Sequence, residues 1–451
     1  GATARDSAIP AAGREDRRGL IGNRCGRRRS KYHSAHPTTP KTAQAAPRAD
    51  TMTGPHLLPL LLLYALMLPV TGMVPVLPDF TAQRFPGLGQ FASHFFMSIN
   101  MIGALLGAPI AGLLSDRLGK RRLLAVGALA ANGVALLGIA WAWHAAESYA
   151  LLLALRFVEG FAHMSALSLL MALAADHAGR AGLGARMGAV GASISLGVAT
   201  GAPLGGVIGG IDPFWVPFGG GLLSLAMAAL GFVRLAEGGG TRPRMAAAAI
   251  VGTLRSRRQL LIPLAFSFAD RLTVGFIVST LSLYLGLVIG FDARQIGIAM
   301  AAFLIPFSVL TWPAGHLSRH WDPLWMMVIG SVLYGVFLAV LGFVPGDRVV
   351  ATMAAGGVIA ALMYAPSLVL AAQYGGSDCR ASALAAFNMA GSLGFATGPL
   401  LSSALLAVFG LLLDRPYPPV FVAIGLIEVV LALAVLVMAR RGRLQAGAAS
   451  A

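Results

Sequence analysis

Residues 112–122 read GLLSDRLGKRR, and this charged stretch separates two long apolar runs. Its first glycine permits a close approach between helices, and its second permits a turn before the cations. Each basic side chain would cost several kcal/mol in hydrocarbon, so the stretch must lie at a membrane surface. The residues of this stretch that we single out for a functional role are Gly112, Ser115, Asp116, Arg117, Gly119, Lys120 and Arg121.

The composition excludes a water-soluble fold. Hydrophobic residues make up 57% of the 451 residues and charged residues only 12%, whereas soluble domains carry about 25% charged residues. Apolar runs long enough to cross a hydrocarbon core of about 30 Å recur along the chain. The sequence therefore predicts an all-α polytopic membrane protein.

The apolar runs predict twelve membrane-spanning helices in two halves of six. The first six runs lie at 57–78, 91–114, 123–143, 149–175, 187–209 and 214–235. The other six lie at 259–287, 295–317, 324–344, 349–372, 382–412 and 419–439. The corresponding domains are an N-terminal half (52–235), a cytoplasmic connector (236–258), a C-terminal half (259–443) and a tail (444–451).

The net charge of +16 does not indicate nucleic-acid binding, because it is divided between an N-terminal stretch and the rest of the chain, which need separate interpretations. Residues 1–51 hold 11 Lys/Arg against 4 Asp/Glu and lack any helical or strand period. We expect a disordered basic extension there, with Met52 as the natural start of the protein. The alternative is a basic arm that binds anionic lipid.

The distribution of Lys and Arg predicts the orientation in the membrane, because cytoplasmic loops carry the excess of both. With both termini inside, 17 of these residues after Met52 fall on the cytoplasmic side and four on the other. The 17 are Arg117, Lys120, Arg121, Arg122, Arg180, Arg186, Arg234, Arg242, Arg244, Arg255, Arg257, Arg258, Arg319, Arg380, Arg440, Arg441 and Arg443. The four are Arg84, Arg294, Arg348 and Arg415.

Three strings resemble motifs of one transporter family. The stretch at 112–122 resembles the loop between helices 2 and 3 of the major facilitator superfamily, and a partial copy, GHLSRH, recurs at 315–320. Residues 156–160, RFVEG, resemble its Arg-x-x-polar-Gly motif. Residues 188–206 are similar to its glycine-rich antiporter motif, with the proline one position late.

The resemblance covers residues 52–443 and implies two pseudo-symmetric six-helix halves that alternate between inward-open and outward-open states. It favours the drug:proton antiporter, or efflux, branch. In the glycine-rich motif, small residues let helices approach closely in lipid. The residues of this motif that we single out are Gly197, Gly201, Pro203, Gly205 and Gly206. They indicate either static packing or a hinge that slides against span 8.

Charges inside spans are the best site markers, because each must be paired or hydrated. Arg156, Glu159 and His163 share one face of span 4, and Asp270 and Arg271 lie in span 7. The resemblance implies that spans 4 and 7 line a common cavity, so the two groups would face each other across it. They are either two structural ion pairs or a substrate and proton site, with Glu159 or Asp270 as the coupling carboxylate.

Two further polar residues lie inside spans. Asn100 is expected to hydrogen-bond between helices, and Glu428 in span 12 is expected to be a packed acid, protonated or hydrogen-bonded, rather than a coupling site.

The sequence thus predicts a proton-coupled exporter of small amphipathic molecules, multi-pass in the cell inner membrane and monomeric. The alternatives are an importer of small organic anions, clamped by Arg156 and Arg271, and a non-transporting membrane assembly factor. We expect no enzyme activity and no cofactor. We also expect no ATP hydrolysis by phosphate-loop chemistry, because Arg121 follows Lys120 where such a loop needs Ser or Thr, so a gradient or a partner would drive any pumping. We expect no metal site, because the two cysteines, Cys25 and Cys379, are isolated.

Overall fold

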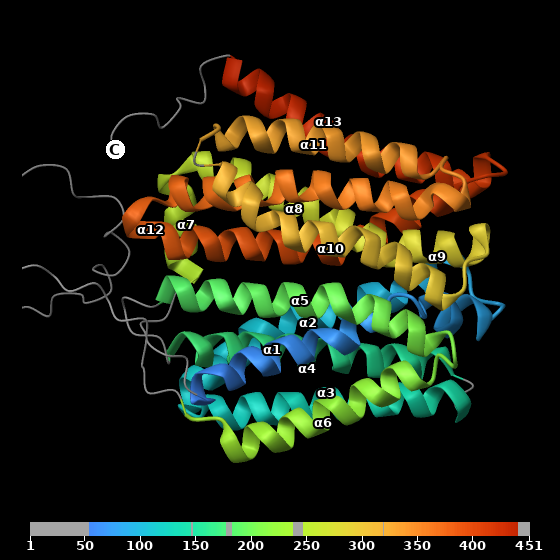
Figure 1. The fold of residues 1–451 in the computed structure, drawn as a ribbon, viewed down its shortest axis with the longest axis horizontal. Coiled ribbons are helices and arrows are strands. Elements are labelled where there is room, and N and C mark those ends of the chain that lie inside the picture. Colours follow the sequence, from blue (N-terminus) through green and yellow to red (C-terminus); the bar gives the residue numbers. More distant parts are fainter. Residues whose placement is uncertain (1–53, 146–147, 177–182, 238–246, 319, 441–451) are drawn as a thin grey trace, which may run out of the picture.

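The computed structural model describes residues 54–145, 148–176, 183–237, 247–318 and 320–440, which form helices joined by short turns (Figure 1). No strand occurs among them. The predicted extension at 1–51 lies outside these residues. So do several members of the predicted cytoplasmic basic set: Arg180, Arg242, Arg244, Arg319, Arg441 and Arg443.

The helices form two bundles, one from each half of the sequence (Figure 1). The N-terminal bundle contains α1 (Gly54–Gly72), η1 (Asp79–Gln83), α2 (Gln90–Leu118), α3 (Arg121–Ala145), α4 (Tyr149–Asp176), α5 (Leu183–Gly209) and α6 (Trp215–Arg234). The C-terminal bundle contains α7 (Ala247–Ser256), η2 (Arg258–Leu260), α8 (Leu261–Phe276), η3 (Ile277–Leu281), α9 (Ser282–Tyr284), η4 (Leu285–Ile289), α10 (Ala293–Leu317), α11 (Pro323–Leu341), α12 (Gly346–Leu412) and α13 (Tyr417–Arg440).

This architecture agrees with the predicted twelve spans. Eleven helical stretches of the described chain are long and apolar enough to cross a membrane, and Leu57–Gly72 is a shorter apolar helix. Spans 10 and 11 are also separate, as predicted: Gly346–Gly376 and Ala386–Leu412 are two apolar stretches of α12, and the non-helical backbone of Gly376, with φ of 61°, makes a kink between them.

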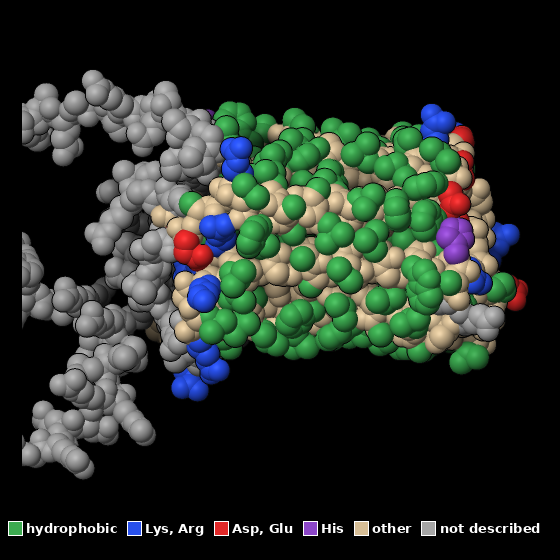
Figure 2. Space-filling model, turned by 90° about the horizontal axis from the view of Figure 1, so that it is seen from below, with side chains coloured by type: hydrophobic (Ala, Val, Ile, Leu, Met, Phe, Trp, Pro, Cys, Tyr) green, Lys and Arg blue, Asp and Glu red, His purple; other side chains and the backbone are tan. Residues whose placement is uncertain are grey.

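The outer surface is apolar along its middle and charged at both ends (Figure 2). Lys120, Arg255 and Arg258 mark one end, which we call the basic end. Arg84, Arg294, Arg348 and Arg415 belong to the turns at the other end, which we call the opposite end.

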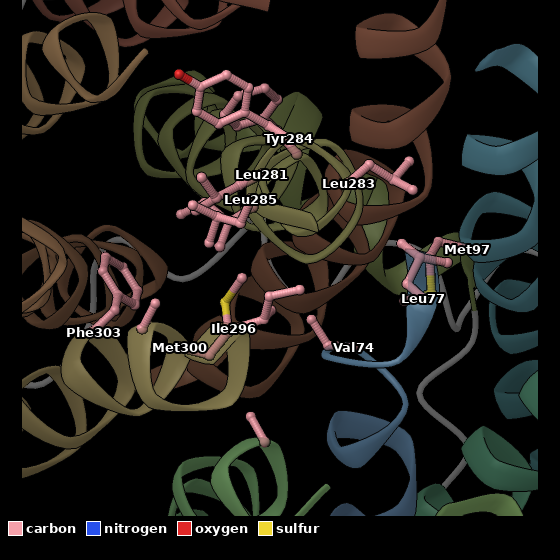
Figure 3. Packing of buried hydrophobic residues seen from close by; sticks show 14 of the residues in the cluster. Val74, Leu77, Met97, Leu281, Leu283, Tyr284, Leu285, Ile296, Met300 and Phe303 are labelled. Carbon is pink, nitrogen blue, oxygen red and sulfur yellow. The ribbon is translucent and has the colours of Figure 1, made fainter. Parts of the chain in front are cut away.

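The two bundles meet along α5 against α10 and α2 against α12. At the opposite end their buried apolar residues form one continuous cluster (Figure 3). The N-terminal bundle contributes Met73, Val74, Leu77 and Met97, and the C-terminal bundle contributes Leu281, Leu283, Leu285, Ile296 and Met300. Exposing one such side chain to water would cost about 1.5–3 kcal/mol, so this contact holds the opposite end closed.

An interruption in span 1 meets an irregular part of span 7 in this cluster. Helix α1 ends at Gly72 and a turn follows at 73–76, while span 7 changes to π-helix on both sides of α9. The hydroxyl of Ser282 in α9 donates a 2.6 Å hydrogen bond to the carbonyl oxygen of Val74. This carbonyl also accepts the backbone N–H of Leu77 at 3.3 Å, so Ser282 adds a contact between the bundles to a turn whose polar groups are satisfied within the protein.

Nearer the basic end, the buried apolar residues of the described chain do not form a shared cluster. One cluster, which includes Leu63 and Leu170, lies within the N-terminal bundle. Two more, around Phe266 and Phe387, lie within the C-terminal bundle. The structure therefore packs the bundles together at the opposite end and leaves their cores separate at the basic end.

The glycines of α5 serve two different contacts. Gly197, Gly201 and Gly205 pack against α1, where an added Cβ would lie within 2.4 Å of an atom of that helix. Gly206 instead faces α10 of the other bundle, and an added Cβ there would lie 2.8 Å from Cα of Gly297. Of these four glycines, Gly206 is therefore the one that contacts α10, the span 8 against which the predicted hinge would slide.

Replacing Gly206 by alanine should open the opposite end. The new Cβ would also lie 2.7 Å from the carbonyl oxygen of Ala293, which is backbone and cannot rotate away. Spin labels at Gly87→Cys and Arg348→Cys, one on each bundle, should report a longer distance in Gly206→Ala. Gly191→Ala on the same helix is the control, because nothing lies within 4 Å of its Cβ position. An unchanged distance in Gly206→Ala would contradict the assignment of this contact.

Candidate functional site

A buried ion pair occupies the middle of α4. Nη1 of Arg156 lies 2.8 Å from Oε2 of Glu159, and both side chains are 0% exposed. The guanidinium of Arg156 also lies 5.0 Å from the ring centre of Phe96 on α2, and its Nη2 lies 3.4 Å from Sδ of Met97. These contacts neutralise both charges within the N-terminal bundle.

Helix α2 reaches this pair because glycine lets the two helices touch. An added Cβ at Gly160 would lie 2.0 Å from the carbonyl oxygen of Asn100. At this distance the amide of Asn100 donates a hydrogen bond to Oε2 of Glu159, which confirms the predicted interhelical role of Asn100. Glu159 thus accepts from Arg156 and Asn100 through one oxygen, and its Oε1 makes no hydrogen bond among the described residues.

His163 lies one turn further along the same helix face. It is buried, and the charge of Arg156 acts on it. The three residues predicted to share a face of span 4 therefore do share one environment.

A second charged group lies in span 7, and it is looser and more accessible. Nε of Arg271 lies 3.9 Å from Oδ2 of Asp270, and the Arg271 side chain is 35% exposed. The guanidinium donates a 2.9 Å hydrogen bond to the hydroxyl of Tyr364 on α12 and stacks 4.9 Å from its ring centre. Arg271 is thus held mainly by Tyr364, which leaves the carboxylate of Asp270 only partly neutralised.

The two groups lie in different bundles. Every partner of Arg156 and Glu159 within the described residues belongs to α2 or α4. Those of Asp270 and Arg271 belong to the C-terminal bundle. The structure therefore brings together the members of each group but forms no direct bond between the groups.

The loop between α2 and α3 is attached to its own bundle. Gly119 adopts φ of 64° and donates its N–H to the carbonyl oxygen of Ser115, which ends α2. Arg121 pairs with Asp176 at the end of α4. Arg122 donates its backbone N–H to Glu237 at 3.0 Å and its guanidinium to the carbonyl oxygen of Phe232.

The remaining members of the loop set differ in exposure. Ser115 is buried, whereas Arg117 and Lys120 are exposed and Gly112 has open space beside it. The side chain of Asp116 lies outside the described residues. Sequence reasoning missed Asp176 and Glu237, although an acid at the end of a span beside a basic loop is a usable signal.

Among the described residues, no group of three or more His, Cys, Asp or Glu side chains could hold a metal ion.

The sequence of this chain matches a known family over most of its length. The profile described as Major Facilitator Superfamily matches residues 60–269 and 264–450. The chain belongs to the Major Facilitator Superfamily. It is thus a multi-pass membrane protein of a transporter family. No curated protein matches it.

Solved structures of this superfamily have the same fold. A mutant of the nucleoside transporter NupG is 13% identical, with a TM-score of 0.72 over 85% of this chain and 100% of that one. A bacterial homologue of the human lysosomal transporter Spinster, in an inward-facing and occupied conformation, is 15% identical, with a TM-score of 0.68 over 85% of this chain and 96% of that one. At such identities these structures establish the fold alone.

Breaking the span 4 pair should destabilise the protein more than removing it. Arg156→Leu leaves Glu159 as an uncompensated buried charge, which costs about 3–5 kcal/mol. The double variant Arg156→Leu/Glu159→Leu should recover most of that loss, as measured by thermal unfolding in detergent. Arg348→Leu is the matched control, because its pair with Asp347 is 3.9 Å long and 78% and 75% exposed. If the double variant is as unstable as Arg156→Leu, the unpaired charge of Glu159 is not the cause of the lost stability.

Proposed function

We propose that this protein is a proton-coupled exporter of small amphipathic molecules that works by alternating access. It acts as a monomer in the cell inner membrane, with both termini and the basic end in the cytoplasm. The observation that carries the proposal is the arrangement of the bundles, which share a buried apolar core only at the opposite end.

The asymmetry of Lys and Arg supports the orientation, because the positive-inside rule assigns the basic end to the cytoplasm. A protein closed at the opposite end is then in an inward-facing state, able to load a cytoplasmic substrate. The likeness to the inward-facing Spinster homologue fits this interpretation.

The buried charges support coupling to protons. A carboxylate in hydrocarbon is stable only while it is paired, so a proton is an alternative to its cation. Asp270 suits this role better than Glu159, because its partner Arg271 is 3.9 Å away and is also bonded to Tyr364. Proton binding at Asp270 would release Arg271 from the ion pair. Binding of the proton and binding of the substrate would then compete, because both are linked to the same conformational change.

Transport in proteoliposomes under an imposed pH gradient tests the proposal. Cationic, neutral and anionic compounds, including a nucleoside, should be screened, and we expect substrate efflux against inward proton flow for at least one amphipathic compound. Asp270→Asn should abolish the response to the pH gradient, whereas Asp347→Asn at the exposed end should keep it. Proton and substrate flow in the same direction would identify an importer, and no flux with any compound would favour an assembly factor.

The loop at 112–122 is proposed as a gate at the cytoplasmic side. Arg121 and Arg122 attach its second part to α4 and α6, so the loop moves with the N-terminal bundle. Asp116, at the end of α2, would then bind the other bundle in one state only.

Asp116→Asn should slow substrate turnover without reducing membrane insertion. The amide keeps the size of the side chain but removes the charge that stabilises one conformation. Turnover at equal expression, compared with Asp347→Asn, provides the measurement. Normal turnover in Asp116→Asn would exclude the gating role.

A further inference from the structure

A hollow in the surface at the basic end contains two arginines that the protein does not neutralise. It has a volume of about 660 Å³ and is lined by Leu254, Arg255, Arg258 and Leu261, and we call it the basic hollow. Arg255 and Arg258 are exposed, and neither makes a hydrogen bond or an ion pair within the part of the chain that the structure describes. Of the four described residues that line the hollow, two are cations and none is an acid.

A break in the backbone places both arginines at this hollow. Helix α7 ends at Ser256, Arg257 has a non-helical backbone with φ of −132°, and η2 begins at Arg258. Arg257 itself is directed to α12, where its Nη1 donates a 3.3 Å hydrogen bond to the carbonyl oxygen of Tyr374. The middle arginine of the three thus attaches the segment to its bundle, while the arginines on either side of it keep their donors for a ligand.

Packing against α12 fixes the walls of the basic hollow at this end of the C-terminal bundle (Figure 1). Thr253 on α7 is only 1% exposed, and Leu254 packs against the buried cluster that includes Leu264 and Phe387. The two guanidinium groups are therefore carried by a segment that is part of the folded core. A ligand that binds them does not have to order this segment first.

The basic hollow lies where the membrane-spanning part of the chain begins. The apolar stretch of span 7 starts at Arg258, and Leu261, the first residue of α8, is 55% exposed. Both arginines thus lie at the polar edge of the span, and Leu261 lies on its apolar side. A ligand that matches this surface is anionic at one end and apolar at the other.

A second hollow at the same end shows what a neutralised basic surface looks like. It has a volume of about 310 Å³ and belongs to the N-terminal bundle, and Lys120, Arg122, Phe232 and Glu237 are among its lining residues. Here Glu237 accepts the backbone N–H of Arg122 at 3.0 Å, and the Arg122 guanidinium donates to the carbonyl oxygen of Phe232. The protein itself supplies the acceptors in this second hollow, whereas the described residues of the basic hollow supply none.

We propose that the basic hollow binds an anionic phospholipid. The phosphate lies between the guanidinium groups of Arg255 and Arg258, and the acyl chains follow the exposed side of Leu261. Guanidinium groups match the geometry of phosphate oxygens, and basic residues beside a span attract anionic lipid at the membrane surface. The volume falls within the range of about 300–1,000 Å³ that is typical of small-molecule sites. Binding here is independent of the proposed transport activity.

Mass spectrometry of the intact, purified full-length protein tests the site. The protein is released from micelles that contain equal amounts of phosphatidylglycerol and phosphatidylcholine with the same acyl chains, and the bound lipids are counted. We expect one tightly bound phosphatidylglycerol. Arg255→Gln and Arg258→Gln should each weaken its binding by about fivefold, and the double variant by about 25-fold, because each cation near the lipid contributes about this factor.

Arg234→Gln is the matched control. Arg234 is also an exposed arginine in the last turn of a helix, α6, but it does not line the basic hollow. Its replacement should change the binding of phosphatidylglycerol by less than about twofold. Residues 1–51 are the same in every variant, so any attraction between that basic stretch and the lipid cancels in the comparison.

The inference is overturned if Arg234→Gln weakens binding as much as Arg255→Gln, because the attraction then belongs to the whole basic surface. Unchanged binding in the double variant, or equal binding of phosphatidylcholine, overturns it as well. Thermal unfolding in detergent separates lipid from a free anion. Phosphatidylglycerol should raise the melting temperature of the unmodified protein and not that of the double variant. An equal rise with inorganic phosphate alone would replace the lipid with a free anion and refute the proposal.

Discussion

The hydrocarbon core provides no hydrogen-bond partner and little screening, and this constraint explains most of the architecture. Backbone groups must be satisfied within the protein, so the spans are helical. Where span 1 is interrupted after Gly72, the hydroxyl of Ser282 from the other bundle donates to the carbonyl oxygen of Val74, which also accepts the backbone N–H of Leu77. The same constraint requires a partner for each charge, which Arg156 and Glu159 provide for each other.

The seam between the bundles shows how one end can open without loss of the fold. At the opposite end the two bundles share apolar side chains and a backbone contact at Gly206 and Gly297. Each bundle also has its own core near the basic end. Because these cores are independent, a rocking movement has to break only the shared cluster and leaves the interior of each bundle intact.

The charged groups of the two bundles are built differently, and the difference suits different tasks. Arg156 and Glu159 are tightly paired, fully buried and supported by Asn100. Asp270 and Arg271 are loosely paired, and Arg271 is held mainly by Tyr364. A pair with a long separation and partial exposure can exchange its proton or bind a ligand at lower cost than a pair sealed by close contacts.

Local patterns in the sequence predicted the elements and failed on the pairings between them. The apolar runs predicted the spans, but they did not reveal the kink at Gly376 that lies between spans 10 and 11. The shared face of Arg156, Glu159 and His163 followed from helical spacing. The partners Asp176, Glu237 and Tyr364 did not, because each comes from a different helix and no periodicity within one helix reveals them.

The sequence by itself determined that the chain spans a membrane, that its basic loops mark one side and that its halves repeat. These properties follow from hydrophobicity, charge and helical spacing, which act along the chain. Only the tertiary structure decided at which end the bundles share a core, that Gly206 meets the other bundle, and that Glu428 packs against Gly335. These properties depend on contacts between residues far apart in sequence, which are set by how the helices pack.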